Sequence, residues 1–373
     1  MLQFSRSLAA GTYHSVVLTD DHSIWCFGKN VYGVFGCPSV SSKTTPIKIE
    51  IPSEISYVQA VCSSSVNTFI IDQEDYVWRC GANNYGQLGK GENNVASSDF
   101  YFQKLLNIPK IQFVSASPLH SLMLDSDGAV WSCGNDEQGQ LGWGGDLRLQ
   151  VNTIPHKIPN IPPIQMVAAG NFHSLFLDAD GCVWGCGSNA YNQLGCERNC
   201  SCFEIQKVKG LETIKFICSG SFHSIFITDE GGVQTTGKND ANQLGTCTSL
   251  DRKIVTIENL NRIRFASASL SFSAFLDEYG DVYCCGKISP RQNVLATPQQ
   301  ILNLPEINYF QVGLAHMLLI DNDGIVWAFG DNSYGQLGLE DTRFRKSPEK
   351  IQNLEQAYIL STNFSLTKSA RNI

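Results

Sequence analysis

The sequence predicts an all-β fold, a seven-bladed β-propeller built from repeats of about 50 residues. Three observations support this prediction: a glycine-rich phrase recurs, short β-prone runs accompany each copy, and turn residues separate the runs. The phrase reads GANNYGQLG at 81–89, GNDEQGQLG at 134–142 and GDNSYGQLG at 330–338. Its seven opening glycines are Gly28, Gly81, Gly134, Gly187, Gly237, Gly286 and Gly330, at spacings of 53, 53, 53, 50, 49 and 44 residues.

A repeat of this length suits either a propeller blade or a helical-repeat unit, and the local pattern decides between them. Runs such as SLMLD (121–125), SLFLD (174–178) and SIFIT (224–228) are followed by turns such as SDG and ADG. A second run then ends in glycine, as in AVWSCG, CVWGCG and IVWAFG. Such segments are typical of β-hairpins, and no copy carries an apolar stripe of helical period and length. We therefore expect one blade per copy.

The recurring phrase is interpreted as a turn followed by an apolar plug. Its bend position holds Gly33, Gly86, Gly139, Asn192, Asn242 and Gly335. Glycine and asparagine are the residues that best tolerate positive φ, so their exchange at one position predicts a left-handed backbone there. The apolar residues that follow are Phe35, Leu88, Leu141, Leu194, Leu244 and Leu337. We expect them to fill space between neighbouring blades.

A large side chain recurs three residues before each opening glycine. The position holds Trp25, Trp78, Trp131, Trp184, Gln234, Tyr283 and Trp327. Because aromatic rings bury a large area per residue, packing between blades is the favoured role, with ligand binding as the alternative.

Closure of the ring cannot be read directly from the repeats. The segment that begins each repeat occurs eight times, whereas the glycine phrase occurs seven times. The chain begins with SLAAGTYHSVVLT and ends with AYILSTNFSLT, which resembles the same half-repeat. We expect residues 1–373 to form a single propeller domain in which a C-terminal strand near 348–354 completes the first blade. Residues 355–373 would then duplicate the N-terminal half, and one copy would lie outside the ring or displace the other.

Composition and charge exclude several classes of partner. Charged residues make up 17% of the chain and the formal net charge is −8, without a basic tail. Nucleic acids and anionic membranes are bound through clustered Lys and Arg, so we expect neither as a direct partner. No apolar run approaches the roughly 18 residues of a membrane span. We expect a soluble, cytoplasmic monomer, with the nucleus as an alternative location.

The repeats resemble the regulator of chromosome condensation family. The segment GNFHSLFLDADGCVWGCGSNAYNQLG at 170–195 carries almost the whole family pattern, and the match extends over essentially the whole chain. The resemblance implies a seven-bladed propeller. The sixth copy, SLSFSAFLDEYGDVYCCGKISPRQNVLA, lacks the Gly-Gln-Leu-Gly ending, so we expect one atypical blade interface.

Family membership leaves the function open. Some members resemble the exchange factor for the nuclear GTPase Ran, and others are attached to ubiquitin ligases, kinases or membrane-binding domains. Because the repeats use nearly all of the chain, we expect no such attached domain here. The exchange factor also carries an extra β-wedge, for which the nearest candidate is KGENNVASSDFYFQKLLN at 90–107.

Five histidines recur at one repeat position, and the favoured role for them is structural. They are His14, His120, His173, His223 and His316, with Asn67 and Phe272 at the same position in the other copies. We expect each imidazole to bond a neighbouring backbone group. A metal or catalytic ring is the alternative. In the Ran exchange factor, histidine and acidic residues of one face matter, but no acidic residue directly precedes these histidines.

Candidate partner-binding residues fall in the phrase loops. The acidic candidates are Asp136, Glu137, Asp240 and Asp331, which could share one rim, with solvated turn residues as the alternative. The aromatic candidates are Tyr32, Tyr85, Tyr191 and Tyr334, which precede the bend residue. Tyrosine is favoured at binding hot spots, and packing is the alternative for these four.

Four of the fourteen cysteines recur directly before the opening glycine, at one strand position: Cys80, Cys133, Cys186 and Cys285. Equivalent positions a blade apart are rarely close enough to bridge, so these cysteines are interpreted as small buried thiols in a reducing compartment. The stretch CERNCSC at 196–202 is the exception, since Cys196, Cys200 and Cys202, together with Cys182, could hold zinc. The spacing lacks a paired C-x2-C, so we expect no metal and no cofactor. No nucleophile elbow or phosphate-binding loop is present either, and we identify no catalytic residue.

Two functions follow from the sequence. The first is a protein–protein interaction module whose rim loops bind another protein. The alternative is a guanine nucleotide exchange factor for a Ran-like small GTPase, acting on the switch and phosphate region without covalent chemistry.

Overall fold

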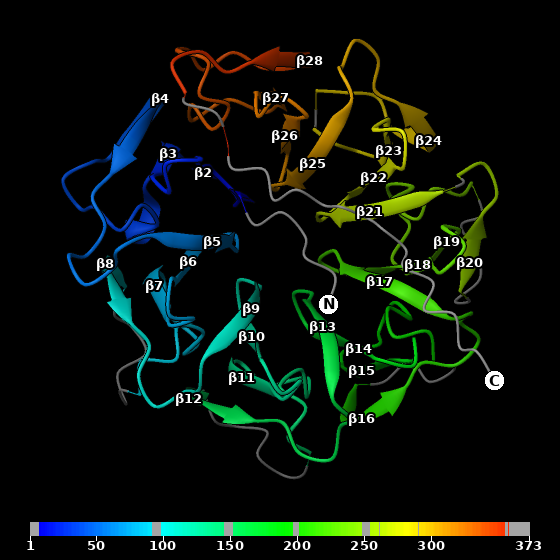
Figure 1. Cartoon of the computed structure of the whole chain (residues 1–373). Helices are drawn as coiled ribbons and strands as arrows, with labels where there is room; N and C mark the ends of the chain where they lie inside the picture. The colour runs from blue at the N-terminus through cyan, green and yellow to red at the C-terminus, as the bar shows by residue number, and fades with distance from the viewer. Residues whose placement is uncertain are drawn as a thin grey trace, which may run out of the picture.

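The computed structural model describes residues 7–91, 98–144, 152–196, 201–247, 254–260, 262–289, 291–354 and 357. Within these ranges the chain forms seven four-stranded antiparallel sheets, arranged as blades around a central channel (Figure 1). The prediction of an all-β, seven-bladed propeller is therefore confirmed. Among the described residues the one helical element is a 3-10 turn, η1 (Val31–Gly33).

The four strands of each blade follow one another both in sequence and in space. Blade 1 comprises β1 (Leu8–Ala10), β2 (His14–Leu18), β3 (Ile24–Lys29) and β4 (Ser42–Ile49). Blade 2 comprises β5 (Val58–Ser63), β6 (Asn67–Asp72), β7 (Val77–Gly81) and β8 (Asp99–Lys104). Blade 3 comprises β9 (Ile111–Ala116), β10 (His120–Asp125), β11 (Val130–Gly134) and β12 (Asn152–Lys157). Blade 4 comprises β13 (Ile164–Ala169), β14 (His173–Asp178), β15 (Val183–Gly187) and β16 (Cys202–Lys207).

The remaining blades have the same order. Blade 5 comprises β17 (Ile214–Ser219), β18 (His223–Thr228), β19 (Val233–Gly237) and β20 (Val255–Ile257). Blade 6 comprises β21 (Ile263–Ala268), β22 (Phe272–Asp277), β23 (Val282–Gly286) and β24 (Leu295–Gln300). Blade 7 comprises β25 (Ile307–Val312), β26 (His316–Asp321), β27 (Val326–Gly330) and β28 (Arg345–Lys350). The first strand of each blade lies nearest the channel and the fourth lies at the outer rim (Figure 1).

The apolar core lies between the blades. Every residue of the second strand is buried in all seven blades. Most residues of the outer strands are half-buried or exposed. One apolar cluster joins Val16 and Cys26 of blade 1 to Ile70 and Trp78 of blade 2, which confirms packing between blades for this tryptophan. Its indole N–H also donates to the Asp72 carboxylate (2.8 Å) in the hairpin turn of the same blade. Sheets that bury both faces in this way depend on their neighbours for stability.

The recurring phrase forms the turn and plug that the sequence predicts. All six bend residues have positive φ, between 60° at Asn242 and 83° at Gly139. The six plug residues are at most 6% exposed. At Gly139 a side chain is also excluded by crowding, because a Cβ would lie 2.6 Å from the Phe203 Cα of the next blade. The bend therefore requires both a left-handed backbone and a close approach to the neighbouring sheet.

A side-chain amide or carboxylate organises each of these turns, which the sequence interpretation missed. In six copies its oxygen accepts the backbone N–H of the plug residue, at 2.8–2.9 Å. The acceptors are Asn30, Asn83, Asp136, Asn189, Asn239 and Asn332. A short polar side chain that bonds nearby backbone is a common device for fixing a turn.

Neighbouring blades are joined by a repeated pair of hydrogen bonds around one buried hydroxyl, which we call the junction hydroxyl. In blade 4 it is Ser174, which lies 2.8 Å from Nε2 of His120 in blade 3 and donates to the Gln140 carbonyl (2.6 Å) of the same blade 3. The equivalent hydroxyls in the other complete pairs are Ser15, Thr68, Ser224 and Ser273. The predicted structural role of the histidines is thus correct, but their partner is a side-chain hydroxyl, not a backbone group.

The hydrogen-bond pair also fixes the protonation of the imidazole. A serine has one hydroxyl proton. Because Ser174 donates that proton to Gln140, the His120 Nε2 must carry the hydrogen of the other bond. Burial lowers the pKa of His120 and of His173 to about 3, so both rings are neutral at physiological pH. Each imidazole is therefore a fixed donor to the next blade.

The interface between blades 6 and 7 is atypical, as the sixth copy predicts. Phe272 occupies the histidine position, and Met317 occupies the hydroxyl position of blade 7. Arg264 on β21 also crosses this interface, donating to the carbonyls of Ile307 (3.1 Å) and Asn308 (2.8 Å) on β25. These two hydrogen bonds lie near the hairpin end of the blades, at the opposite end from the position of the junction hydroxyl.

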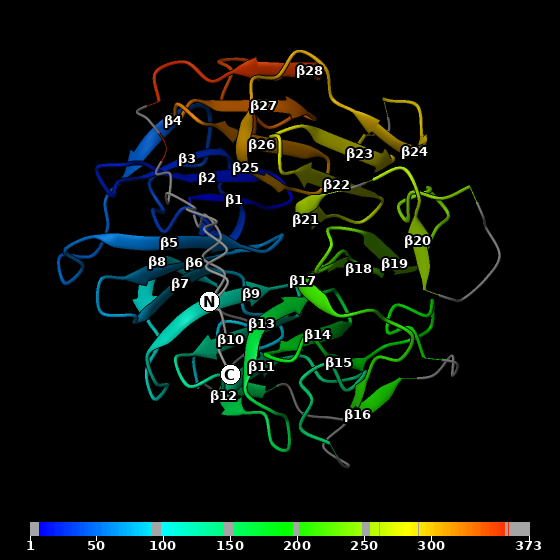
Figure 2. The ribbon, with the colours of Figure 1, turned by 45° about the vertical axis from the view of Figure 1, so that its right-hand side comes forward.

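The predicted ring closure is wrong. A strand does form in the expected region, but this strand, β28, pairs with β27 as the outer strand of blade 7. Blade 1 is completed by the N-terminal half-repeat, because β1 pairs with β2 and lies between β25 and β5 (Figure 2). β1 lies at the inner edge of blade 1 and β4 at its outer edge.

Of the C-terminal half-repeat, Ala357 alone lies among the described residues. It forms an isolated antiparallel bridge to Thr19 and donates its backbone N–H to the Gly324 carbonyl (2.8 Å). What was expected of the rest of residues 355–373 falls outside the described residues.

Replacing Ser174 with alanine should destabilise the propeller by about 1–3 kcal/mol, because His120 Nε2 and the Gln140 carbonyl would both lose a buried partner. Chemical denaturation followed by tryptophan fluorescence measures the change. Ser333→Ala serves as the matched control, since Ser333 is exposed, and its effect should stay within about 0.5 kcal/mol. Equal losses in both variants would contradict a junction role for Ser174.

Candidate functional site

At one end of every blade lie the turn that enters the second strand and the phrase loop that leaves the third strand. We call the side of the propeller formed by these ends the loop face. The turn entering the second strand and the phrase loop leaving the third strand meet there, because neighbouring strands run antiparallel. Backbone hydrogen bonds join the two segments, as from Ser188 N to Phe172 O (2.7 Å) and from Asp331 N to Ala315 O (2.8 Å). All eight partner-binding candidates from the sequence lie in phrase loops of this face.

An aromatic–lysine cluster lies on the loop face at the junction of blades 7 and 1. Tyr334 from blade 7 makes an edge contact with Tyr13 of blade 1, with ring centroids 4.7 Å apart. The Lys29 ammonium, also from blade 1, lies 4.5 Å from the centre of the Tyr334 ring. Both tyrosines stay more than one third exposed, Tyr13 at 37% and Tyr334 at 38%. The cluster therefore presents two rings and a cation to solvent.

The same arrangement recurs at the junction of blades 4 and 5. Tyr191 from blade 4 contacts Phe222 of blade 5, with centroids 5.5 Å apart, and Phe222 stacks on Phe172 at 5.8 Å. The Lys238 ammonium lies 5.4 Å from the Tyr191 ring and 5.6 Å from the Phe222 ring. Tyr191 is 45% exposed. The two clusters thus use equivalent positions of two different blade junctions.

Sequence reasoning found the tyrosines of these clusters but missed their partners. Tyr13 and Phe222 directly precede the recurring histidine, and Lys29 and Lys238 directly follow the opening glycine. These partners can be recognised from the sequence only if the phrase loop of one copy is compared with the beginning of the next blade, because the contacts cross the junction between blades. Tyr32 and Tyr85, the other two candidates, are 44% and 39% exposed.

The four acidic candidates do not form one free rim. Asp240 forms an ion pair with Lys238 (2.9 Å), and that lysine is the main cause that lowers the pKa of Asp240 against the opposing effect of burial. Asp331 accepts hydrogen bonds from Ser333 (2.7 Å) and Gln336 (2.8 Å). Glu137 is exposed. Most of this negative charge is therefore engaged within the turns.

Asp136 is buried, contrary to the idea that it lies on the rim. Its side chain occupies the position that asparagine holds in other copies and accepts the Leu141 N–H at 2.8 Å. The residue is 8% exposed, and burial raises the pKa of the carboxyl to about 6 although the Leu141 bond opposes that shift. Its role in the described structure is to hold the turn.

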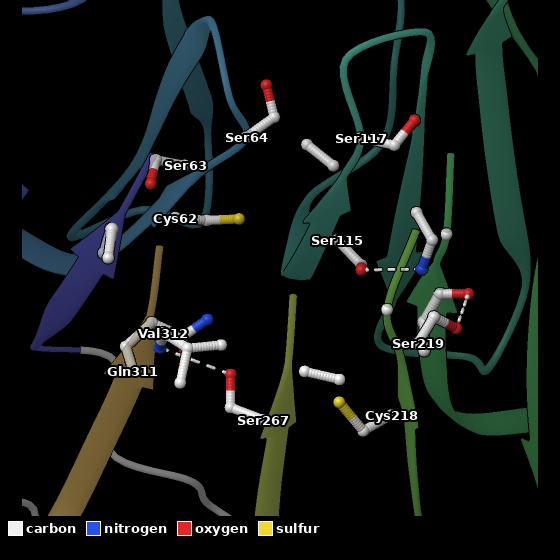
Figure 3. Close-up of a pocket in the computed structure, with 18 of the residues that line it drawn as sticks. Cys62, Ser63, Ser64, Ser115, Ser117, Cys218, Ser219, Ser267, Gln311 and Val312 are labelled. Carbon is white, nitrogen blue, oxygen red and sulfur yellow. Dashed lines mark hydrogen bonds between the residues drawn. The ribbon is translucent and has the colours of Figure 1, made fainter. Parts of the chain in front are cut away.

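The channel between the inner strands contains a cavity of about 260 Å³. Figure 3 shows hydroxyl and thiol side chains around it, among them Ser63, Ser115, Cys62 and Cys218. Part of this polarity is used between blades, since Ser115 accepts the Ala169 N–H at 3.0 Å. The described residues that line the cavity include no charged side chain. Burial raises the pKa of Cys62 and of Cys218 to about 12, so these thiols are poor nucleophiles.

The predicted zinc candidates are only partly brought together. Cys196 and Cys202 place their sulfur atoms 3.7 Å apart, whereas Cys182 lies in the hairpin turn at the opposite end of blade 4. Cys200 falls outside the described residues. Within the described ranges no three His, Cys, Asp or Glu side chains are grouped as metal ligands. The same ranges contain no helix long and apolar enough to cross a membrane.

The segment 90–107, considered as a candidate wedge, contains an ordinary strand in its described part. Residues of β8 pair with β7 as the outer strand of blade 2. Arg79 on β7 forms a buried ion pair with Asp99, and Lys90 bonds the same carboxylate at 2.7 Å. These contacts hold both ends of the intervening loop against the blade.

Comparison with known protein families agrees with this geometry. The RCC1-like domain matches residues 2–292, and the regulator of chromosome condensation (RCC1) repeat matches residues 323–361. The chain belongs to the RCC1-like domain family. The resemblance inferred from the repeats is therefore confirmed.

Curated relatives of this RCC1-like propeller include proteins of different kinds. The probable E3 ubiquitin-protein ligase HERC6 of Homo sapiens is 32% identical over 188 residues, covering 50% of this chain and 18% of the relative. The regulator of chromosome condensation of Xenopus laevis is 31% identical over 206 residues, covering 50% of this chain and 47% of the relative. The matched part thus spans less than half the length of either relative.

Solved structures share the fold of this RCC1-like propeller. Human WBSCR16 superposes with a TM-score of 0.79 at 21% identity, covering 88% of this chain and 94% of the other. Prp20p of Saccharomyces cerevisiae, studied for its binding to Gsp1p and histones, superposes with a TM-score of 0.77 at 22% identity, covering 89% and 86%. At these identities the likeness establishes the fold alone.

Replacing Asp136 with asparagine should stabilise the protein at pH 7.5 by on the order of 1 kcal/mol, because a buried charge is removed while the turn hydrogen bond is kept. The pKa of about 6 in the folded state lies above the ordinary aspartate value of 3.8. The folded state therefore binds this proton more tightly than the unfolded state does. As the pH rises from about 4 to above 6, ionisation of Asp136 lowers the free energy of unfolding.

Denaturation of both proteins at pH 4 and pH 7.5 tests this expectation. The stability difference between Asp136→Asn and the parent should be small at pH 4 and larger at pH 7.5. A difference that is the same at both values would contradict a titrating, buried Asp136.

Proposed function

We propose that this RCC1-like propeller is a protein–protein interaction module whose loop face binds another protein. The observation that carries the proposal is the repetition of an exposed aromatic–lysine cluster at two junctions, around Tyr334 and around Tyr191. Tyrosine is enriched at hot spots because its ring buries a large area at a small entropic cost. Repetition on one face gives a partner two anchoring points.

The lysines make these clusters suited to a partner that combines apolar and acidic groups. Lys29 and Lys238 are held beside the rings by cation–π contact, and Lys238 is also paired with Asp240, so Lys29 is the cation that an acidic group of a partner would meet. Preorganised side chains lose less entropy on binding than free ones. Tyr32, Tyr85 and Glu137 extend the proposed surface, since all three are exposed on phrase loops of the same face.

Nucleotide exchange on a Ran-like small GTPase is the second candidate. It is supported by the similarity to the Xenopus regulator of chromosome condensation and by the fold shared with Prp20p, which was studied for binding to Gsp1p. The local geometry favours it less. Asp136 is buried, and Asp240 and Asp331 are bonded within their turns, so the acidic rim offers little charge that could disturb bound magnesium or phosphate.

We further propose a monomer in the cytoplasm, with the nucleus as the alternative location. No disulfide joins any two cysteines of the described residues, which suits a reducing compartment.

Replacing Tyr191 and Tyr334 together with alanine should reduce partner binding at least about tenfold, because two hot-spot side chains would be removed. The wild-type protein and the variant serve as bait in extracts, and each captured protein is then purified and titrated against both. Tyr279→Ala is the matched control, since Tyr279 is 61% exposed in the hairpin turn of blade 6, away from the loop face. Equal affinities for all three baits would contradict binding through the loop face.

Release of a fluorescent guanine nucleotide from a Ran-like GTPase separates the two candidate functions. Acceleration by the wild-type protein, reduced by the Tyr191 and Tyr334 substitutions, would establish exchange. Unchanged release at micromolar protein, together with capture of a partner through the loop face, supports the interaction module alone.

A further inference from the structure

Two thiols approach each other in the phrase loop of blade 4. The Sγ atoms of Cys196 and Cys202 are 3.7 Å apart. Cys196 directly follows the closing glycine of the phrase, and Cys202 is the first residue of β16. A disulfide needs a sulfur separation of about 2.05 Å, which side-chain rotation can supply from this starting distance. Residues 197–200, between the two cysteines, lie outside the described residues.

Cys196 differs from the recurring cysteines of the third strands. Burial raises the pKa of Cys133 and of Cys285 to about 12, so these thiols stay protonated. Cys196 is half-buried, and the hydrogen bond from Cys202 lowers its pKa to about 7 against the opposing effect of burial. A thiolate that is both ionised and reachable from solvent is the reactive form of cysteine.

We propose that Cys196 and Cys202 form a reversible redox pair, in which Cys196 is the attacking thiol and Cys202 the resolving thiol. Cys202 is 5% exposed, so a soluble oxidant reaches Cys196 first. The Cys196 thiolate attacks one sulfur of glutathione disulfide and releases one glutathione thiolate. Cys202 then loses its proton, attacks the Cys196 sulfur and releases the second glutathione. The two protein thiols have lost two electrons and two protons, and one glutathione disulfide has become two glutathiones.

The bond would join two points that are already fixed in the blade. Asn189 donates its side-chain N–H to the Cys196 carbonyl at 3.0 Å and also accepts the Leu194 N–H at 2.9 Å. Cys202 is registered opposite Gly187 on β15. Because both ends are held by the fold, the oxidised state requires little rearrangement outside the loop.

Peptide mapping of the full chain tests the proposal directly. Reduced protein is equilibrated at pH 7 with mixtures of reduced and oxidised glutathione, quenched with an alkylating agent and digested with trypsin. Cleavage after Arg198 separates Cys196 from Cys202, so the two peptides stay together only through a disulfide. We expect a linked peptide pair that forms with oxidised glutathione and is lost with dithiothreitol.

Three single variants identify the partners. Cys200→Ser should keep the link, which then involves Cys202. Cys202→Ser should trap Cys196 as a stable mixed disulfide with glutathione. Cys196→Ser should leave Cys202 unmodified, because it is buried.

Cys247 provides the internal control, since it is an exposed cysteine two residues after the closing Gly245 in the phrase loop of blade 5. Cys196 should be alkylated about tenfold faster than Cys247 at pH 7, because the hydrogen bond from Cys202 favours the Cys196 thiolate. Three results would overturn the proposal: absence of the linked peptides, loss of the link in Cys200→Ser, or equal reactivity of Cys196 and Cys247.

Discussion

The propeller depends on one buried hydroxyl at the junction between neighbouring blades. Each such Ser or Thr receives a hydrogen bond from a histidine of the preceding blade and donates to a carbonyl of that blade's phrase loop. The phrase loop itself is held by an Asn or Asp side chain, so a single network joins the turn, the plug and the next sheet. Buried networks of this kind are costly when one partner is missing, which makes them specific.

The same interaction explains how the ring closes without a shared strand. Ser15 of blade 1 accepts from His316 of blade 7 at 3.0 Å and donates to the Gln336 carbonyl at 2.7 Å. The first and last blades are therefore joined by the same contacts that join blades adjacent in sequence. The interface between blades 6 and 7 lacks this hydrogen-bond pair, and Arg264 crosses it at the other end of the blades by donating to two carbonyls of β25.

The parts of the structure that could be predicted from the sequence are those that repeat. The bend residues, the plugs and the structural histidines recur at fixed positions, and a recurring position has a recurring environment. Ring closure could not be predicted, because the two half-repeats at the termini have similar patterns and both fit the slot beside β2. The sequence did indicate that Asp136 holds a turn, because asparagine fills the equivalent position in the other turns. The negative charge of Asp136 instead suggested a place on the surface.

The aromatic–lysine clusters show a different limit of sequence reasoning. Tyr334 and Lys29 are separated by most of the chain and meet only because the ring closes. Their exposure leaves them free of the packing that fixes the junctions, so the loop face can serve recognition while the buried network preserves the ring. Because the buried junctions hold the ring together and the exposed loop face makes the contacts with partners, the loops can differ between proteins of this fold without disturbing the ring.

A double-mutant cycle at the closing junction tests the central claim most directly. The substitutions are Ser15→Ala and His316→Phe, since phenylalanine naturally fills the equivalent position in blade 6. Unfolding free energies of the parent, both single variants and the double variant give the coupling between the two side chains. The account predicts a coupling of about 1 kcal/mol or more, as expected for a buried hydrogen bond. A coupling near zero would contradict the conclusion that this hydrogen bond holds the ring together.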